Sequence, residues 1–263
     1  MQAEVKGIKV QYELTGPESA PVVACSHSLA GSMAIWDSQV AALEGKYRVL
    51  RYDTRGHGGS SAPDEPYTME MLASDAAALF DVLEIEKVHF MGISMGGMIG
   101  QTLALMHPEK VASLILCDTT CMVPEAMQPV WEERITTARE KGMAAMVDET
   151  LARWFSPMFL EKTPETIARI REIILKTPVP GFVGCSRAIS NFNVHEDLSR
   201  IVVPTLIMVG ENDPGTPVEA SRQIRDGIPD AVMVELPDAY HLSNIEAAEA
   251  FNENLMAFMA KQQ

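Results

Sequence analysis

The sequence has little positive charge: 21 lysines and arginines stand against 36 acidic residues, giving a formal net charge of −15 at pH 7. Such a field repels phosphate groups, so we expect neither nucleic acid nor an anionic membrane as a partner. Long hydrophobic runs are also lacking, since no apolar stretch approaches the roughly 20 residues of a membrane span. The first residues contain no apolar signal region, and we therefore expect a cytoplasmic protein.

Cysteine is scarce as well, and its spacing is uninformative for metals. The four cysteines are Cys25, Cys117, Cys121 and Cys185, and no two form a C-x-x-C pair. A zinc site or redox motif is therefore not indicated, and we expect free thiols. The glycine-rich stretch 55–60 matches neither the G-x-x-x-x-G-K-[ST] nor the G-x-G-x-x-G pattern of nucleotide loops. We interpret it as a tight loop after a strand, and we expect no metal and no organic cofactor.

Hydrophobic residues make up 47% of the 263 residues, enough for one large domain with a sizeable core. From residue 20 to 120, short apolar runs alternate with stretches of helical periodicity. This alternation predicts a parallel sheet covered by helices on both faces, with an antiparallel hairpin over residues 5–15 at its edge. The expected strands are 21–26, 47–53, 88–91 and 111–117, and the expected helices are 33–44, 68–83 and 97–106.

The pattern changes after residue 120. Residues 122–200 contain helical stretches without a strand pattern, and strands resume only at 204–210 and 231–236. We therefore predict a core of residues 1–121 and 201–263, interrupted by a helical insertion over 122–200. The insertion leaves the core at the carboxyl ends of the strands, where ligands bind in open α/β sheets, so we expect a lid. The expected helices of the later chain are 132–141, 143–154, 164–176 (ended by Pro178–Gly181), 218–226 and 243–260.

Gly92-Ile93-Ser94-Met95-Gly96 is the most informative motif of the chain. It follows a buried strand and opens a buried helix, as a G-x-S-x-G nucleophile elbow does. The glycines are needed because backbone and helix crowd together at such a turn. We therefore predict that Ser94 is a nucleophile, exposed at the carboxyl edge of the sheet.

A serine needs a base, and only three histidines follow Ser94. His107 ends the elbow helix, about 13 residues at roughly 1.5 Å each from the serine, and is interpreted as structural. His195 lies near the end of the insertion and is interpreted as a surface or hinge residue. His241 follows the last expected strand, on the edge that carries the elbow, and is the predicted base.

The acid that orients the base should follow a strand between Ser94 and His241. Asp213 fits best, since it lies in a loop stiffened by two prolines and a glycine after strand 204–210. Glu211 and Asp118 are the competing acids.

Negative charge that develops on a substrate oxygen needs hydrogen-bond donors. The backbone N–H of Met95, the residue after the nucleophile, is one predicted donor, and the N–H of Leu29 after the first parallel strand is the other. We interpret His27 as packing beneath this oxyanion loop, not as a second base.

These residues together resemble the α/β-hydrolase family over nearly the whole chain, which implies a mostly parallel eight-stranded sheet with a helical lid. Within the family the chain is most similar to 3-oxoadipate enol-lactonases. The similarity is carried by His27-Ser28-Leu29, by the stretches 50–58, 92–101 and 241–246, and in the insertion by Arg153-Trp154-Phe155 and Gly184-Cys185. The resemblance implies hydrolysis of an enol-lactone that carries a carboxylate, in the β-ketoadipate pathway of aromatic catabolism.

The residues by themselves predict a serine hydrolase that works through an acyl-enzyme on a small-molecule ester or lactone. A substrate carboxylate would need a positive partner, for which Arg134 and Arg187 are the candidates, and Trp131 and Trp154 are candidates for an apolar pocket. A general carboxylesterase, a C–C bond hydrolase and a receptor that binds without turnover remain alternatives. A dehalogenase or epoxide hydrolase is excluded because it needs a carboxylate at position 94. We expect a monomer or a small homo-oligomer.

Overall fold

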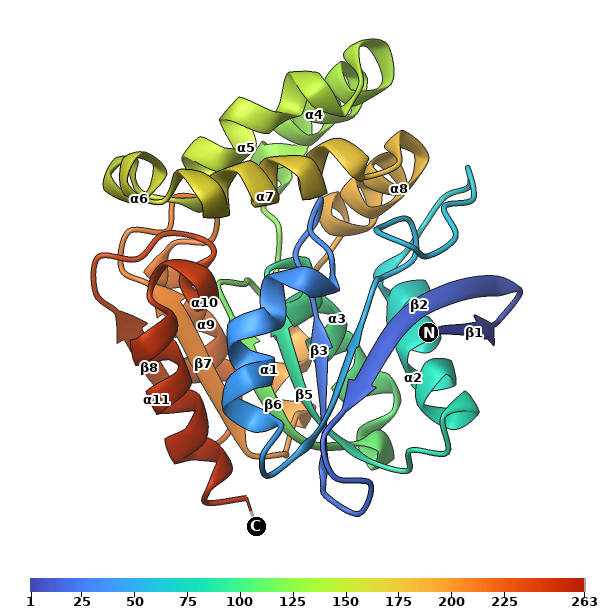
Figure 1. Ribbon diagram of the computed structural model, residues 1–263, viewed down its shortest axis with the longest axis vertical. Coiled ribbons are helices and arrows are strands. Elements are labelled where there is room, and N and C mark those ends of the chain that lie inside the picture. Colours follow the sequence, from blue (N-terminus) through green and yellow to red (C-terminus); the bar gives the residue numbers. More distant parts are fainter. Residues whose placement is uncertain (263) are drawn as a thin grey trace.

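The computed structural model describes residues 1–262, and it is built around one twisted sheet of eight strands (Figure 1). The strand order is β1-β2-β4-β3-β5-β6-β7-β8. The strands are β1 Gln2–Val5, β2 Ile8–Thr15, β3 Val22–Ser26, β4 Arg48–Tyr52, β5 Val88–Ile93, β6 Val111–Cys117, β7 Thr205–Gly210 and β8 Val232–Leu236. Gln263, the last residue of the expected core segment, lies outside the described residues.

The sheet is mostly parallel, as predicted. From β4 to β8 every neighbouring pair is parallel, whereas β1 pairs with β2 and β2 with β4 in the antiparallel sense. All residues of the central strands β5 and β7 are buried, which explains their continuous apolar runs. The edge hairpin begins at Gln2, earlier than predicted, and turns at Lys6 and Gly7, both with positive φ.

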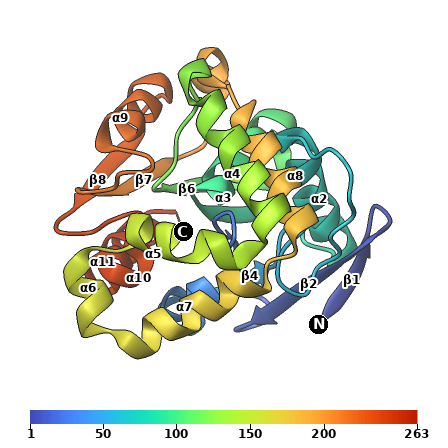
Figure 2. The same cartoon turned by 90° about the horizontal axis from the view of Figure 1, so that it is seen from above.

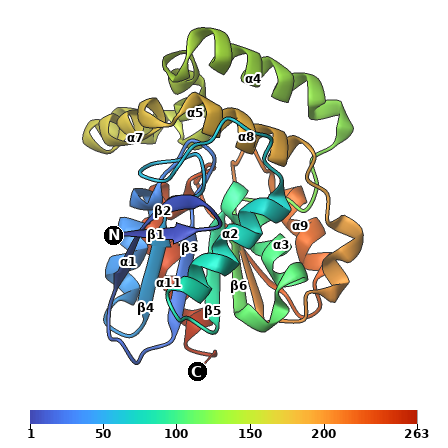
Figure 3. The same ribbon diagram turned by 90° about the vertical axis from the view of Figure 1, so that its right-hand side faces the viewer.

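Helices cover both faces of the sheet (Figure 3). On one face α1 packs against α11, and on the other α2 packs against α3, with α9 beside β7. The predicted closing helix is two helices, because the backbone breaks at Ala247. The helices of these faces are α1 Asp37–Leu43, α2 Met69–Val82, α3 Met95–Met106, α9 Val218–Gly227, α10 Ser243–Glu246 and α11 Ala248–Met259, and short 3-10 helices span Met33–Trp36, Pro108–Lys110, Glu125–Met127, Met143–Met146 and His195–Arg200.

Five further helices form a layer above the carboxyl edge of the sheet, which we call the helical layer (Figures 1 and 2). They are α4 Gln128–Lys141, α5 Val147–Trp154, α6 Pro157–Lys162, α7 Pro164–Lys176 and α8 Val179–Ser190. The sequence pattern indicated neither α6 nor α8. Pro157 and Pro180 lie in the first turns of these helices, where proline needs no N–H partner and its fixed φ suits the helix. Pro180 therefore begins a helix instead of only ending one.

Two backbone features stand out where the helical layer meets the core. The chain segments entering and leaving the layer run side by side, with Val123 N–H donating to Phe192 C=O and Val194 N–H to Cys121 C=O, both at 2.8 Å. Near the start of α8, the backbone of Gly181 lies directly on that of Gly56. A Cβ atom at position 181 would lie 2.0 Å from the Gly56 oxygen. In the part of the chain that the structure describes, no helix is long and apolar enough to cross a membrane.

Candidate active site

Ser94 occupies a strained turn between β5 and α3. Its φ of 55° and ψ of −116° are unusual for a residue with a side chain. Two glycines permit the turn: a Cβ atom on Gly92 would lie 2.1 Å from the Gly96 oxygen, and one on Gly96 would lie 2.1 Å from the Ser26 oxygen. The Ser94 carbonyl accepts a hydrogen bond from the Thr119 hydroxyl at 2.7 Å, which fixes the turn from below.

A continuous hydrogen-bonded chain links Ser94, His241 and Asp213. The Ser94 Oγ lies 2.9 Å from His241 Nε2, and His241 Nδ1 lies 2.8 Å from Asp213 Oδ2. The two hydrogen-bonded pairs span 147 and 28 positions of the chain, so the fold brings the three residues together. The three side chains have the relative arrangement of nucleophile, base and orienting acid.

The loop after β7 holds the Asp213 carboxylate rigidly. Its Oδ1 accepts from the Gly215 and Thr216 N–H groups at 2.7 and 3.1 Å, and its Oδ2 accepts from the Thr216 hydroxyl at 2.7 Å. The competing acids are bound elsewhere. Glu211 is exposed and accepts from Asp238 N–H, and Asp118 accepts from Gly210 N–H at 2.8 Å and from the Ser243 hydroxyl.

The charges of the site follow from burial and from these bonds. Burial alone would lower the pKa of His241, but the Asp213 carboxylate beside it raises that pKa above its usual value. Burial would raise the pKa of Asp213, but His241 and Thr216 hold it below its ordinary range. Burial, with the nearby Asp213 charge, raises the pKa of Asp118 to about 8. At neutral pH the negative charge of the site is therefore concentrated on Asp213.

The two predicted oxyanion donors lie at the chain positions where such donors are needed. Met95 begins α3 directly after Ser94, and Leu29 follows β3. Among the described residues, neither backbone N–H has a hydrogen-bond partner. The next residue, Ala30, has a φ of 60° and donates its N–H to His57 Nε2 at 2.9 Å. The imidazole of His57 thereby fixes the backbone of the oxyanion loop at Ala30.

Two buried histidines support this loop, and sequence reasoning identified only one of them. His27 bonds to the Ser28 C=O at 2.8 Å through Nδ1 and accepts from Thr54 N–H at 2.9 Å through Nε2. His57, in the glycine-rich loop after β4, was missed, although its unusual Arg-Gly-His-Gly-Gly-Ser setting was a usable signal. Burial lowers the pKa of His27 to about 4 and that of His57 to about 3. Both imidazoles are therefore uncharged at neutral pH and support the loop through hydrogen bonds.

These neutral imidazoles predict acid sensitivity. The imidazole pKa is 6.5 in the unfolded chain, whereas in the folded protein it is about 4 for His27 and about 3 for His57. Below pH 6.5 the unfolded state therefore binds more protons than the folded state. The free energy of unfolding should fall by about 2.5 kcal/mol per histidine between pH 7.5 and pH 4.5. His57→Gln should be less stable at pH 7.5 by about 1–3 kcal/mol, but its further loss at pH 4.5 should be smaller. Urea unfolding at both pH values measures this, with His107→Gln as the control. Equal pH dependence in H57Q and wild type would contradict it.

The helical layer carries two arginines whose charges act on each other, Arg134 and Arg153. Arg134 is half-buried, with its guanidinium carbon 4.5 Å from the centre of the Trp131 ring and 5.8 Å from that of Phe182. Within residues 1–262 Arg134 has no ion-pair partner, and its Nε makes no hydrogen bond. Burial and the charge of Arg153 lower the pKa of Arg134 to about 9. Arg153, which sequence reasoning missed as a site residue, bonds only weakly to Glu149 at 3.3 Å, and its charge also acts on His241.

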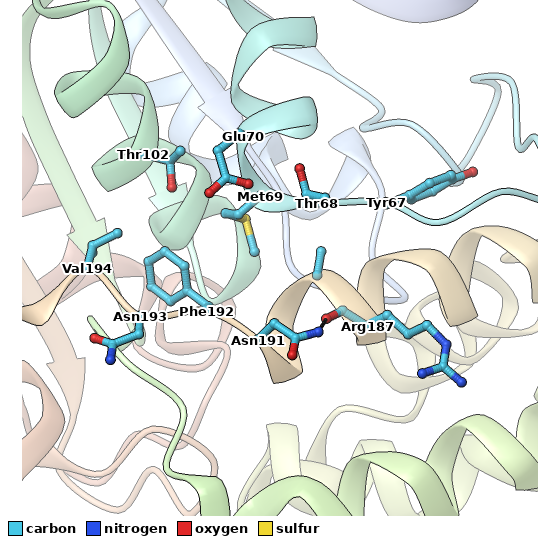
Figure 4. Close-up of a pocket in the computed structure, with 11 residues that line it drawn as sticks. Tyr67, Thr68, Met69, Glu70, Thr102, Arg187, Asn191, Phe192, Asn193 and Val194 are labelled. Carbon is cyan, nitrogen blue, oxygen red and sulfur yellow. Dashed lines mark hydrogen bonds between the residues drawn. The ribbon is translucent and has the colours of Figure 1, made fainter.

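The other two predicted pocket residues have different surroundings. Trp154 is buried, and its carbonyl accepts the Leu242 N–H at 3.1 Å. Arg187 pairs with Glu132 at 3.0 Å and lines a cavity of about 200 Å³ between α2 and α8. Figure 4 shows its guanidinium pointing away from Phe192 and Thr102 in that cavity. None of the three linked residues Ser94, Asp213 and His241 lines the cavity, so the structure does not bring Arg187 to them.

The sheet order, with its antiparallel edge, and the strained serine between β5 and α3 are those of an α/β hydrolase. The chain belongs to the alpha/beta hydrolase fold family, whose sequence profile matches residues 21–248. It is 34% identical to 3-oxoadipate enol-lactonase 2 of Acinetobacter baylyi over 254 residues, which are 97% of this chain and 94% of that protein. The predicted family is thereby confirmed.

Solved structures agree with this assignment. The crystal structure of the enol-lactonase from Burkholderia xenovorans LB400 is similar with a TM-score of 0.96 and 37% identity, covering 99% of this chain and 100% of that one. A thermophilic esterase from Thermogutta terrifontis, solved with malate bound, is similar with a TM-score of 0.91 and 28% identity, covering 100% and 98% of the two chains.

Proposed function

We propose that this protein hydrolyses a carboxylic ester or lactone through an acyl-enzyme on Ser94. The observation that carries the proposal is the hydrogen-bonded chain from Ser94 Oγ through His241 to Asp213. His241 Nε2 takes the serine proton while Oγ attacks the carbonyl carbon. The carbonyl oxygen becomes an oxyanion, which accepts hydrogen bonds from the N–H groups of Leu29 and Met95. Asp213 keeps the imidazole in the tautomer that accepts this proton and balances the imidazolium.

The reaction is completed in two further steps. The tetrahedral intermediate collapses, the bond to the leaving oxygen breaks, and His241 returns its proton to the leaving group. In an enol-lactone the leaving oxygen is an enol that stays attached to the acyl chain and converts to the ketone. Water, deprotonated by His241, then attacks the acyl-enzyme and releases the acid and Ser94. This chemistry uses no metal and no organic cofactor.

We propose 3-oxoadipate enol-lactone as the substrate, and the helical layer over residues 122–200 as a lid on a core of 1–121 and 201–263. The names of the enol-lactonase relatives support this substrate. So does the pair Arg134 and Arg153, which offers two positive charges with no strong ion pair to neutralise them. A net charge of −15 repels an anionic substrate, so a local basic pair is needed to hold its carboxylate. Trp131, which is stacked on Arg134, would line the substrate pocket beside this pair of arginines.

Kinetics with two substrate types test the substrate class. Arg134→Gln and Arg153→Gln should each raise KM for the carboxylated lactone by about 10-fold or more, since hydrogen bonds to charged groups contribute about 1.5–3 kcal/mol. KM for p-nitrophenyl acetate, which has no carboxylate, should change less than about threefold. Arg187→Gln is the matched control and should leave both values unchanged. A wild-type enzyme that prefers the aryl ester would favour the general carboxylesterase, an alternative that the esterase similarity supports.

A further inference from the structure

We propose that Glu246 is a positioning residue that joins the helical layer to the loop of the catalytic base, so that the layer and His241 keep one fixed geometry. The inference rests on the proposed role of His241. Glu246 is the last residue of α10, five positions after the histidine. It does not touch the hydrogen-bonded chain itself, and its effect on the reaction passes through the backbone on either side of His241.

The Glu246 carboxylate uses both oxygens to connect two distant segments. Its Oε2 accepts the Tyr240 N–H at 2.8 Å, and its Oε1 accepts the Ser156 N–H at 3.0 Å. Tyr240 immediately precedes His241, whereas Ser156 is the N-cap of α6 in the helical layer, 90 residues away. One side chain therefore holds a donor of each segment.

A third hydrogen bond completes the joint from the other side of the histidine. The N–H of Leu242, immediately after His241, donates to the Trp154 carbonyl at the end of α5 at 3.1 Å. The backbone on both sides of His241 is thus tied to the turn between α5 and α6, at Leu242 directly and at Tyr240 through Glu246. The direction of the imidazole then depends on where the helical layer lies.

Trp154, Phe155 and Leu242 are buried on one side of this joint, but on the side of Glu246 the packing is incomplete, so the hydrogen bonds help to fix its geometry. A cavity of about 230 Å³ lies between α6 and the loop before His241, and its lining includes Ser156, Phe159, Ala239 and Glu246. Apolar side chains therefore do not fill the space beside the bridge. Only a carboxylate offers two acceptor oxygens, since glutamine replaces one of them with a donor that would face an N–H group. The bridge thus requires Glu at this position.

The expected consequence concerns turnover more than binding. Displacing a catalytic group by about 1 Å can cost about 100-fold in rate. Glu246→Gln should therefore lower kcat for p-nitrophenyl acetate by about 10- to 100-fold, with KM changed less than about threefold. Glu246→Asp keeps the charge but is one methylene too short to reach both donors, and its kcat should lie between those of E246Q and wild type. Glu249→Gln, an exposed glutamate three residues further on, is the matched control and should equal wild type.

Hydrogen exchange provides a readout that does not depend on turnover. In E246Q the peptides that contain Tyr240 and Ser156 should lose protection together, with the rest of the chain unchanged, whereas E249Q should show no such loss. The proposal is overturned if E246Q keeps wild-type kcat, or if its exchange rises in only one of the two peptides. If E246Q does not fold, the proposal is tested with E246D alone. Wild-type kcat and wild-type hydrogen exchange in E246D would overturn the proposal.

The design separates failure of this proposal from failure of the proposed function. If wild type hydrolyses neither the lactone nor the aryl ester, or if Ser94→Ala retains turnover, the proposed function itself is wrong. If wild type is active, S94A is inactive and E246Q behaves like E249Q, only the positioning role of Glu246 is lost.

Discussion

Replacing Ser94 with alanine is expected to lower kcat by about 10⁶-fold on any ester that the wild-type enzyme hydrolyses. The reason is that Ser94 Oγ lies 2.9 Å from His241 Nε2, the nitrogen that takes the proton, whereas the nearby Thr216 hydroxyl faces Nδ1 on the Asp213 side of the ring. The remaining activity would come from the oxyanion donors and from substrate binding. Stopped-flow measurement of p-nitrophenol release should show a burst of about one equivalent in wild type and none in S94A.

Stability serves as the control for this variant. Alanine has a Cβ atom as serine does, so it occupies the strained φ of 55° at the same cost, and the melting temperature should stay within about 2 °C of wild type. Steady turnover by folded S94A within tenfold of wild type would contradict the assignment of the nucleophile.

The second large effect is expected for Asp213→Asn, which should lower kcat by about 10⁴-fold. Asparagine can donate its amide N–H to His241 Nδ1, and the imidazole then carries its own proton on Nε2. In this tautomer Nε2 cannot accept the proton of Ser94. In wild type the base must be neutral, and Asp213 raises the pKa of His241 above its usual 6.5. Activity should therefore fall as the pH drops through a midpoint above 6.5.

Removing the Asp213 charge also shifts the pH profile. Without that charge the pKa of His241 falls, so the acid limb of kcat/KM in D213N should move to lower pH than in wild type. Of the other groups that act on His241, Arg153 is charged at neutral pH, whereas Asp118, with its pKa raised to about 8, is largely protonated there. Glu211→Gln, at the exposed competing acid, is the matched control and should keep wild-type rate and profile. Similar losses in E211Q and D213N would show that Asp213 is not the orienting acid.

Much of the fold and the linked residues was predictable because local sterics and chain order restrict them strongly. A serine between two glycines at a strand end has few structural solutions, and only one of the three later histidines follows the last strand. The central strands were recognisable because burial on both faces requires continuous apolar sequence. Asp213 was identifiable for a similar reason, since its loop after β7 carries the residues that stiffen it.

The helical layer was harder to predict because its interactions join residues that are distant in sequence. Nothing near Arg187 in the sequence indicates that it pairs with Glu132. Nor does anything near Arg134 indicate that, within residues 1–262, it forms no ion pair and lies instead against Trp131. From the sequence Glu246 is an ordinary helix residue. Its role depends on the N–H of Ser156, 90 positions away, which donates to its carboxylate. The helices α6 and α8 were missed because proline near their starts resembles proline that ends a helix.

The contact between Gly56 and Gly181 has a consequence for how such enzymes diversify. The helical layer meets the sheet there through backbone alone, with the two glycines too close for any side chain on either. At this contact the position of the layer does not depend on side chains, whereas elsewhere side chains such as those of Arg169 and Thr177 join the layer to the core. A chimaera that carries the layer of a relative therefore needs glycine at both positions, together with the hydrogen bonds of Ser156 and Trp154 to the loop of His241. New substrate preferences could then be acquired by exchanging a module, without rebuilding the machinery beneath it.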